Sequence, residues 1–192
     1  MPTSDEYDKQ PFYAQFPSVF GAFTIYWRET ERGPRVHLVT LPGTNVQVDR
    51  IVRGPGGNPG ASSCPVVAAL AQQIQSSFNG NAVDFSLDIV ALEECSPFQR
   101  RVLLAEYGIP RGWVSTYGRI AKHLGVPGGA RAVGGALSRN PFPIIIPCHR
   151  AIRSTGELGG FGGGVAMKRA LLELEGIVFS GTGKVMTNKV YY

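Results

Sequence analysis

The sequence has 192 residues, of which 43% are hydrophobic, so it is long enough to bury a core in one large or two small domains. Glycine and proline make up about a fifth of it, which indicates many turns, while the hydrophobic share excludes a disordered chain. No apolar run approaches the roughly 20 residues of a membrane span, and the polar, acidic start MPTSDEYDKQ is untypical of a signal peptide. We expect a soluble, intracellular protein.

The charge is divided unevenly along the chain. Residues 1–94 carry six Lys or Arg against ten Asp or Glu, a net charge of −4, whereas residues 95–192 carry thirteen against four, a net charge of +9. A basic half beside an acidic half indicates a polyanion partner for the basic half only, although a solvated surface alone can look the same.

Three cysteines and three histidines restrict the metal and redox chemistry. Cys64, Cys95 and Cys148 form no CxxC pair, so a zinc site of the usual spacing is not expected and no metal is assigned. One thiol is left over from any pairing and is a candidate reactive group. Whether Cys64 and Cys95 form a disulfide stays open.

The segment 1–92 is predicted to be a small α/β domain, with an antiparallel sheet and one helix. Alternating residues predict a strand from Phe23 to Arg28 and a hairpin partner over 36–41, which contains a structural His37. After a Gly/Pro-rich loop at 54–62, a helix is predicted from Pro65 to Phe78. Its apolar stripe is Val66, Val67, Leu70, Ile74 and Phe78. The alternation over 83–90 predicts a further half-buried strand.

The segment 93–178 is predicted to be mostly helical, followed by a tail over 179–192. Ser96-Pro97-Phe98-Gln99 combines a capping box with a proline at the first helical position, which predicts a helix that ends at Gly108. A second helix is predicted from Ser115 or Thr116 to Gly125, and a third to about Arg139. Two helices joined by a short glycine-containing turn in a basic domain suggest a helix-turn-helix.

The outward face of the third helix carries Arg131, Gly134, Gly135 and Ser138. Each glycine inside a helix costs about 1 kcal/mol relative to alanine. The pair therefore indicates either the close approach of a sugar–phosphate backbone, which we favour, or close packing against another helix.

A candidate nucleophile follows the apolar run Ile144–Ile146, which is predicted to be a short strand between two prolines. Cys148, His149 and Arg150 come directly after Pro147. A thiol becomes nucleophilic when positive charge lowers its pKa or a base removes its proton. Because neighbouring side chains of an extended chain point apart, His149 should reach Cys148 through a water. A buried structural thiol beside a surface histidine is the alternative.

A glycine-rich loop and then a helix follow these three residues. The loop GELGGFGGG at 156–164 offers unobstructed N–H groups that could cradle an anion or a carbonyl oxygen, although a flexible linker looks much the same. A helix is predicted over 168–175, closed by Gly176.

Five motifs of residues 96–177 resemble the C-terminal domain of the O6-alkylguanine-DNA alkyltransferases, the methylated-DNA–protein-cysteine methyltransferases. They are SPFQRRVL, VSTYGRIA, GARAVGGALSRNP, PIIIPCHRAI and GGFGGGVAMKRALLELEG. The resemblance implies a winged helix-turn-helix-like domain after a variable, RNase H-like N-terminal domain. It also implies irreversible, single-turnover transfer of an alkyl group from O6-alkylguanine, and from O4-alkylthymine, in duplex DNA to the protein's own cysteine.

The resemblance also implies roles for individual residues. Cys148 would accept the alkyl group, His149 would take the thiol proton through a water, and Glu175 would orient and charge His149. Tyr117 would donate to guanine N3 and promote rotation of the nucleotide. Asn140 would tie the helix-turn-helix to the active-site loop.

Further residues are assigned to DNA and to the base. Arg131 would fill the gap left by the flipped base. The other expected DNA contacts are Thr116, Tyr117, Gly134, Gly135 and Ser138. The expected base pocket comprises the backbone of Cys148 with Ala151, Phe161, Gly162 and Lys168. Phe161 and Gly162 stand where many members have Tyr and several have Ser; a ring and a backbone N–H remain, so activity is still expected.

No cofactor, metal, membrane or obligate protein partner is expected, and the protein should act as a monomer on double-stranded DNA. The resemblance implies a location in the cytoplasm, associated with the nucleoid, or in the nucleus of a eukaryote. The zinc site that some members carry in the N-terminal domain is not supported by these residues. The main alternative is a non-catalytic alkyltransferase-like sensor of DNA damage, but such proteins replace the acceptor cysteine and Cys148 is present. A transcription factor would need a further module for operator recognition, and a cysteine hydrolase would need no basic helix face.

Overall fold

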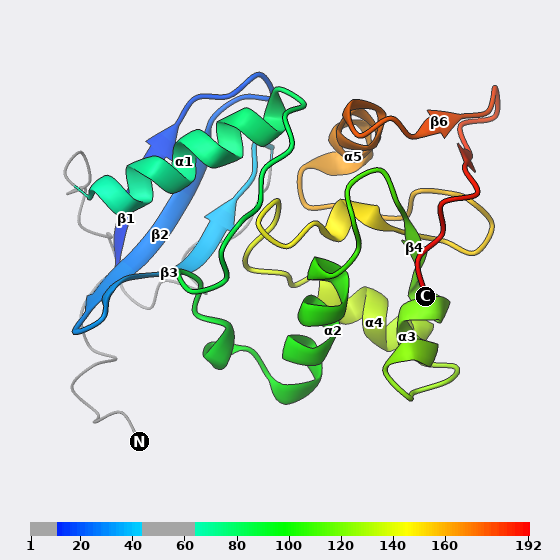
Figure 1. The fold of residues 1–192 in the computed structure, drawn as a ribbon, viewed down its shortest axis with the longest axis horizontal. Helices are drawn as coiled ribbons and strands as arrows, with labels where there is room; N and C mark the ends of the chain where they lie inside the picture. The colour runs from blue at the N-terminus through cyan, green and yellow to red at the C-terminus, as the bar shows by residue number, and fades with distance from the viewer. Residues whose placement is uncertain (1–10, 44–63) are drawn as a thin grey trace.

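The N-terminal part is a three-stranded antiparallel sheet covered by one helix (Figure 1). The computed structural model describes residues 11–43 and 64–192, so the loop predicted at 54–62 lies outside the described residues. The strands are β1 (Phe12–Phe16), β2 (Phe23–Thr30) and β3 (Gly33–Thr40), in the order β1-β2-β3. The hairpin of β2 and β3 is confirmed, whereas β1 was not predicted; its alternating Phe12, Ala14 and Phe16 are a signal that could have shown it.

Helix α1 (Pro65–Phe78) has the predicted bounds and packs its apolar stripe onto the sheet. The ring of Phe78 meets that of Phe23 edge-on, with centroids 5.7 Å apart. Val66 was wrongly placed on this stripe, because it is half exposed and Ala71 takes the inward position instead.

The strand predicted over 83–90 is wrong. Phe85 is buried, as the alternation indicated, but Val90, on the other side of the alternation, is buried too. Among the described residues the segment joins the sheet through a single bridge, between Val36 and Val90. Val36 donates to the Ile89 carbonyl and accepts from Ala91, and the Tyr107 hydroxyl donates to the Phe85 carbonyl. The segment is therefore a connection that touches β3 at one residue and bonds elsewhere to α2.

The C-terminal part is a group of short helices with small paired strands (Figure 1). Its elements are η3 (Leu92–Glu94), α2 (Pro97–Tyr107), β4 (Ser115–Thr116), α3 (Tyr117–His123), α4 (Ala130–Leu137), η4 (Cys148–Arg150), β5 (Ala151–Ile152), α5 (Gly164–Leu174), β6 (Val178–Phe179) and β7 (Val185–Met186). Helices α2, α3 and α4 pack on one another, and β4 pairs with β5 in parallel. Helix α5 begins four residues before the predicted Lys168 and is followed by Gly176, at φ +84°.

The first turn of α2 is hydrogen-bonded to the segment that follows α4. Ser96 Oγ accepts from the Gln99 amide at 3.3 Å, as the capping motif predicts. The Gln99 side chain does not close the capping box but donates to the Arg139 carbonyl at 2.8 Å. The end of α4 is thereby tied to the first turn of α2.

Buried residues of the sheet, α1, α2, α4 and the active-site segment form one continuous hydrophobic cluster. Cys64, Cys95 and Cys148 are all free thiols, so the Cys64–Cys95 disulfide is not formed. After β7 the chain returns to the helices, where Val190 bridges Val114 and the Tyr192 hydroxyl donates to the Ala105 carbonyl. None of the described helices is long and apolar enough to cross a membrane.

Candidate active site

The apolar run Ile144–Ile146 is a tight turn and not the predicted strand. Ile144 has φ +75°, and Ile146 donates to the Phe142 carbonyl at 2.8 Å. Asn140 holds this turn from both sides: its Nδ2 donates to the Ile146 carbonyl at 3.0 Å and its Oδ1 accepts from the Phe142 amide at 2.9 Å. A side-chain amide that pairs with the backbone competes with strand pairing, which explains the turn.

Cys148 opens the 3₁₀ turn η4, directly after this turn and Pro147. Its amide donates to the Ile146 carbonyl, so Asn140 and Cys148 share one backbone acceptor. Asn140, which follows α4, therefore sets the position of the thiol.

His149 is almost fully buried, and its Nε2 lies 2.9 Å from Glu175 Oε1. Because a carboxylate only accepts, Nε2 carries the hydrogen, which leaves Nδ1 of a neutral ring as a proton acceptor. Nδ1 is buried and has no hydrogen-bond partner among the described residues. An acceptor of this kind suits the predicted water between His149 and Cys148.

Arg150, to which sequence reasoning gave no role, completes a cluster of charged side chains around Glu175. Its Nε and Nη2 donate to Glu175, at 3.0 Å to Oε2 and 2.8 Å to Oε1, and its Nη1 donates to the Ile109 carbonyl. The carboxylate also accepts from the Gly112 amide at 3.3 Å. Glu175 is therefore held by two other segments of the chain, through Arg150 and Gly112, while it orients His149.

The pKa values define the resting state of this cluster. Burial raises the pKa of the Cys148 thiol to about 11, partly offset by the hydrogen bond from Asn140. Burial lowers the pKa of His149, against the opposing effect of Glu175. Burial alone would raise the pKa of Glu175, but His149 and Arg150 outweigh it and hold that pKa at about 2. At neutral pH the site therefore holds a thiol, a neutral imidazole and a carboxylate, in which the imidazole can accept the thiol proton.

Tyr117 opens α3 and reaches across to the glycine-rich loop. A Cβ on Gly159 would lie 2.7 Å from the Tyr117 hydroxyl, and Gly159 has φ +73°. Burial raises the pKa of Tyr117 to about 12, so its hydroxyl keeps its proton and can donate. The close contact of ring and backbone requires a glycine at this position.

Of the predicted base-pocket residues, Phe161 lies near His149 and Lys168 near Tyr117, but Lys168 has a different role from the predicted one. Lys168 is fully buried, and its Nζ donates to the Ala151 carbonyl at 2.6 Å and to the Gly160 carbonyl at 3.4 Å. Its ammonium thus holds together two backbone segments instead of lying free in a pocket. The Phe161 ring stands edge-on to His149, with centroids 6.3 Å apart, and Gly162 is exposed.

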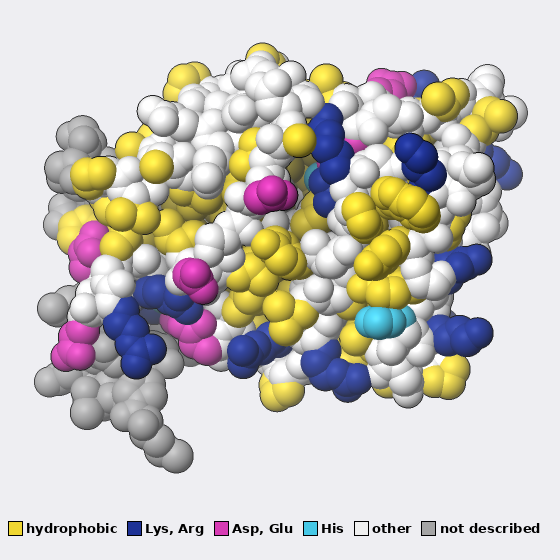
Figure 2. Space-filling model, viewed as in Figure 1, with side chains coloured by type: hydrophobic (Ala, Val, Ile, Leu, Met, Phe, Trp, Pro, Cys, Tyr) yellow, Lys and Arg dark blue, Asp and Glu magenta, His cyan; other side chains and the backbone are white. Residues whose placement is uncertain are grey.

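The residues predicted to contact DNA lie on α3 and α4. Thr116 caps α3, since its Oγ1 accepts from the Arg119 amide, while Arg131 and Ser138 are exposed. A Cβ on Gly134 would make an ordinary contact of 3.9 Å with Tyr117, and one on Gly135 would be 3.8 Å from the flexible end of Arg139. Helix packing therefore does not require these glycines. On the face shown in Figure 2, Lys and Arg side chains follow the lower edge of the helical part.

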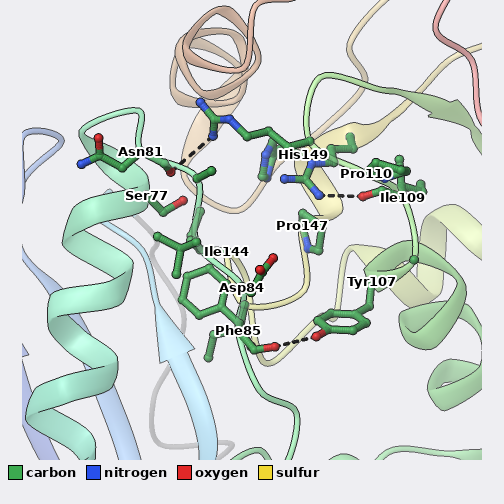
Figure 3. Close-up of a pocket in the computed structure, with 16 residues that line it drawn as sticks. Ser77, Asn81, Asp84, Phe85, Tyr107, Ile109, Pro110, Ile144, Pro147 and His149 are labelled. Atoms are coloured by element: carbon green, nitrogen blue, oxygen red, sulfur yellow. Dashed lines mark hydrogen bonds between the residues drawn. The ribbon is translucent and has the colours of Figure 1, made fainter.

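A cleft of about 270 Å³ lies between the end of α1 and the segments around η4 (Figure 3). It is lined by His149 and Arg150 together with Phe85, Tyr107 and Ile144, but Cys148 and Tyr117 are not part of its wall. The cleft therefore borders the charged cluster from the N-terminal side and is not the predicted base pocket.

The fold and site define a class of protein, in which a free thiol and a buried histidine–glutamate pair lie beside a basic pair of helices. Residues 97–177 match the family model described as 6-O-methylguanine DNA methyltransferase, DNA binding domain. A methylated-DNA–protein-cysteine methyltransferase of Methanothermobacter thermautotrophicus is 46% identical over 121 residues, which cover 62% of this chain and 68% of the relative. One of Mycobacterium leprae is 47% identical over 109 residues, covering 56% and 64%.

Solved structures of relatives are similar to this chain over a larger share of its length. The crystal structure of Mycobacterium tuberculosis OGT in complex with DNA has 32% identity and a TM-score of 0.67, covering 85% of this chain and 92% of that one. The O6-methylguanine methyltransferase of the same organism has 34% identity and a TM-score of 0.70, covering 86% and 92%. The chain belongs to the methylated-DNA–protein-cysteine methyltransferase family.

Proposed function

We propose that this protein repairs DNA by direct reversal, transferring the alkyl group of O6-alkylguanine in duplex DNA to its own Cys148. The observation that carries the proposal is the placement of Cys148 beside a neutral, buried His149 whose free Nδ1 can take the thiol proton. The shared family and the DNA complex of the Mycobacterium tuberculosis relative support it.

The transfer step forms one bond and breaks one. The thiol proton passes through a water to His149 Nδ1, and the positive charge on the ring is balanced by Glu175. The sulfur attacks the alkyl carbon, the C–O6 bond breaks, and its electron pair leaves on the guanine. Tyr117 would donate to guanine N3, where part of that charge collects. The thioether has no leaving route, so each molecule acts once, without a cofactor.

The DNA-binding part of the proposal rests on α3 and α4. They would act as a winged helix-turn-helix within residues 93–178, behind an N-terminal domain of RNase H-like type over 1–92. An O6-alkyl group is buried in the stack, so the base must be extruded, which costs a few kcal/mol. Arg131, exposed near the start of α4, would fill the vacated space. O4-alkylthymine would be a second substrate, and one monomer would suffice.

Stoichiometric transfer tests the function directly. Duplex DNA with labelled O6-methylguanine should pass its label to the protein up to one equivalent, and the label should be found on the Cys148 peptide by mass spectrometry. Binding of the modified duplex without any label on protein would favour the damage-sensor alternative. Release of label to solvent with turnover would indicate a hydrolase.

Gly159→Ala should slow transfer by about tenfold or more and lower the melting temperature. The new Cβ would overlap the Tyr117 hydroxyl, and the left-handed backbone conformation costs a non-glycine residue about 1–2 kcal/mol. Single-turnover rates with labelled duplex and thermal melts would measure both effects.

Gly160→Ala is the matched control for this loop. Its Cβ would meet nothing within 4 Å, and its φ is not in the left-handed region, so both rate and stability should stay near those of the unchanged protein. Equal behaviour of the two variants would mean that Tyr117 does not depend on the close approach at Gly159.

A further inference from the structure

Glu106 is a buried carboxyl group next to the site that the transfer step does not use. It lies on the inner face of α2 among Val102, Leu103 and Ala105, and none of its surface is exposed. Neither carboxyl oxygen has a hydrogen-bond partner among the described residues. A buried carboxylate without partners is costly, so its presence in an otherwise apolar helix face needs an explanation.

The ionisable groups that interact with Glu106 come from η4, α3, α5 and the end of the chain. Lys168 of α5 and Arg150 of η4 are the cations that lower its pKa, and the backbone amide of Ala151 contributes only weakly. Glu106 in turn raises the pKa of Cys148 on η4, of Tyr117 on α3 and of Tyr192 at the end of the chain. Glu106 therefore lies in electrostatic reach of both the acceptor thiol and the proposed proton donor.

Lys168 is the second half of this arrangement. Its Nζ is fully buried and donates to the carbonyl of Ala151, the residue that follows η4. It lies 5.9 Å from the centroid of the Tyr117 ring and favours a negative charge on Cys148. A cation and a carboxyl group thus flank the same short stretch of chain and act on the thiol with opposite signs.

We propose that Glu106 is a positioning residue that, together with Lys168, sets the charge balance around Cys148. The proposal deepens the proposed function and rests on it. With its carboxyl group protonated, Glu106 leaves the positive charge of Lys168 to favour the thiolate. Once ionised, it offsets that charge and opposes thiolate formation.

The direction of the pH effect follows from this arrangement. Burial raises the pKa of Glu106 to about 8, so the carboxyl group is neutral at physiological pH and ionises above it. Burial also lowers the pKa of Lys168 to about 8, so its positive charge is lost over the same pH range. The reactivity of Cys148 should rise with pH as thiolate forms, but less steeply above about pH 8. The same raised pKa means that this group favours folding at low pH and that its contribution is lost as pH rises through about 8.

The test compares Glu106→Gln with the unchanged full-length protein from about pH 6 to about pH 10. The rate of Cys148 carboxamidomethylation by iodoacetamide, read from the Cys148 peptide by mass spectrometry, reports the thiolate without requiring any repair activity. Transfer of benzyl from the free base O6-benzylguanine is measured in parallel. Glu173→Gln is the control, because it makes the same chemical change on an exposed face of α5.

Glu106→Gln should react at the unchanged rate near pH 6 and about three- to tenfold faster near pH 9, with a shallower bend, because only the loss of the Lys168 charge then remains. Glu173→Gln should retain the bend. Superimposable profiles for Glu106→Gln and the unchanged protein would overturn the proposal. If the variant does not fold, the unchanged protein still decides the matter, since a profile that rises without a bend near pH 8 contradicts it.

The two readouts separate this proposal from the proposed function. A bend in the iodoacetamide profile that Glu106→Gln makes shallower, without any benzyl transfer, would support the role of Glu106 and contradict repair. Benzyl transfer with no effect of Glu106→Gln on either profile would support repair and contradict the role of Glu106.

Discussion

Cys148→Ser should abolish transfer of label from O6-methylguanine duplex DNA, by at least about a thousandfold, while DNA affinity and the melting temperature stay close to those of the unchanged protein. A serine hydroxyl holds its proton far more tightly than a thiol, and His149 is not basic enough to generate an alkoxide in the ground state. The half-buried side chain at position 148 changes little in volume, so the turn held by Asn140 should persist.

The other two cysteines provide the control for this prediction. Cys64 and Cys95 are free thiols outside the site, and Cys64→Ser and Cys95→Ser should each still accept one equivalent of label. Their transfer is measured with the same duplex, alongside gel-shift affinity and thermal melting for all three variants. Label on the Cys148→Ser protein at a comparable rate would show that the acceptor is another residue.

Arg131→Ala should slow repair of duplex DNA about 10- to 100-fold and leave the reaction with O6-benzylguanine nearly unchanged. Extruding a base costs a few kcal/mol, and each 1.4 kcal/mol that Arg131 offsets corresponds to a tenfold difference in rate. The free base needs no extrusion. Alanine keeps the helix propensity of α4, and the exposed Arg131 side chain is not part of the buried core.

Arg139→Ala is the matched control, because it removes an exposed arginine just after the same helix. Its backbone carbonyl, which accepts from Gln99, remains in place. Rates are measured in single turnover with protein in excess over saturating DNA, so that a general loss of charge is not mistaken for a loss of base extrusion. Equal losses on duplex and free base for Arg131→Ala would mean that Arg131 supports the fold.

Local signals in the sequence determined where most helices begin and end. The helix over 65–78 follows from Pro65 at its first position and from Asn79-Gly80 behind it, and Ser96 caps α2 as its motif indicates. The chemistry of the acceptor site was also open to sequence reasoning, because Cys148, His149 and Glu175 lie within motifs specific to one family. Capping and turn preferences act within a few residues, so they can be recognised without the rest of the chain.

Only the tertiary structure decided which alternating or apolar runs became strands. Residues 83–90 and 144–146 have strand-like patterns, but a strand needs a partner along its edge, and Val36 and Asn140 take their peptide groups instead. The same holds for Glu106 and Arg150, to which sequence reasoning assigned no role. Their roles depend on Lys168 and Glu175, which lie 62 and 25 residues further along the chain, and only folding brings these charges together in a buried site where they act strongly on each other.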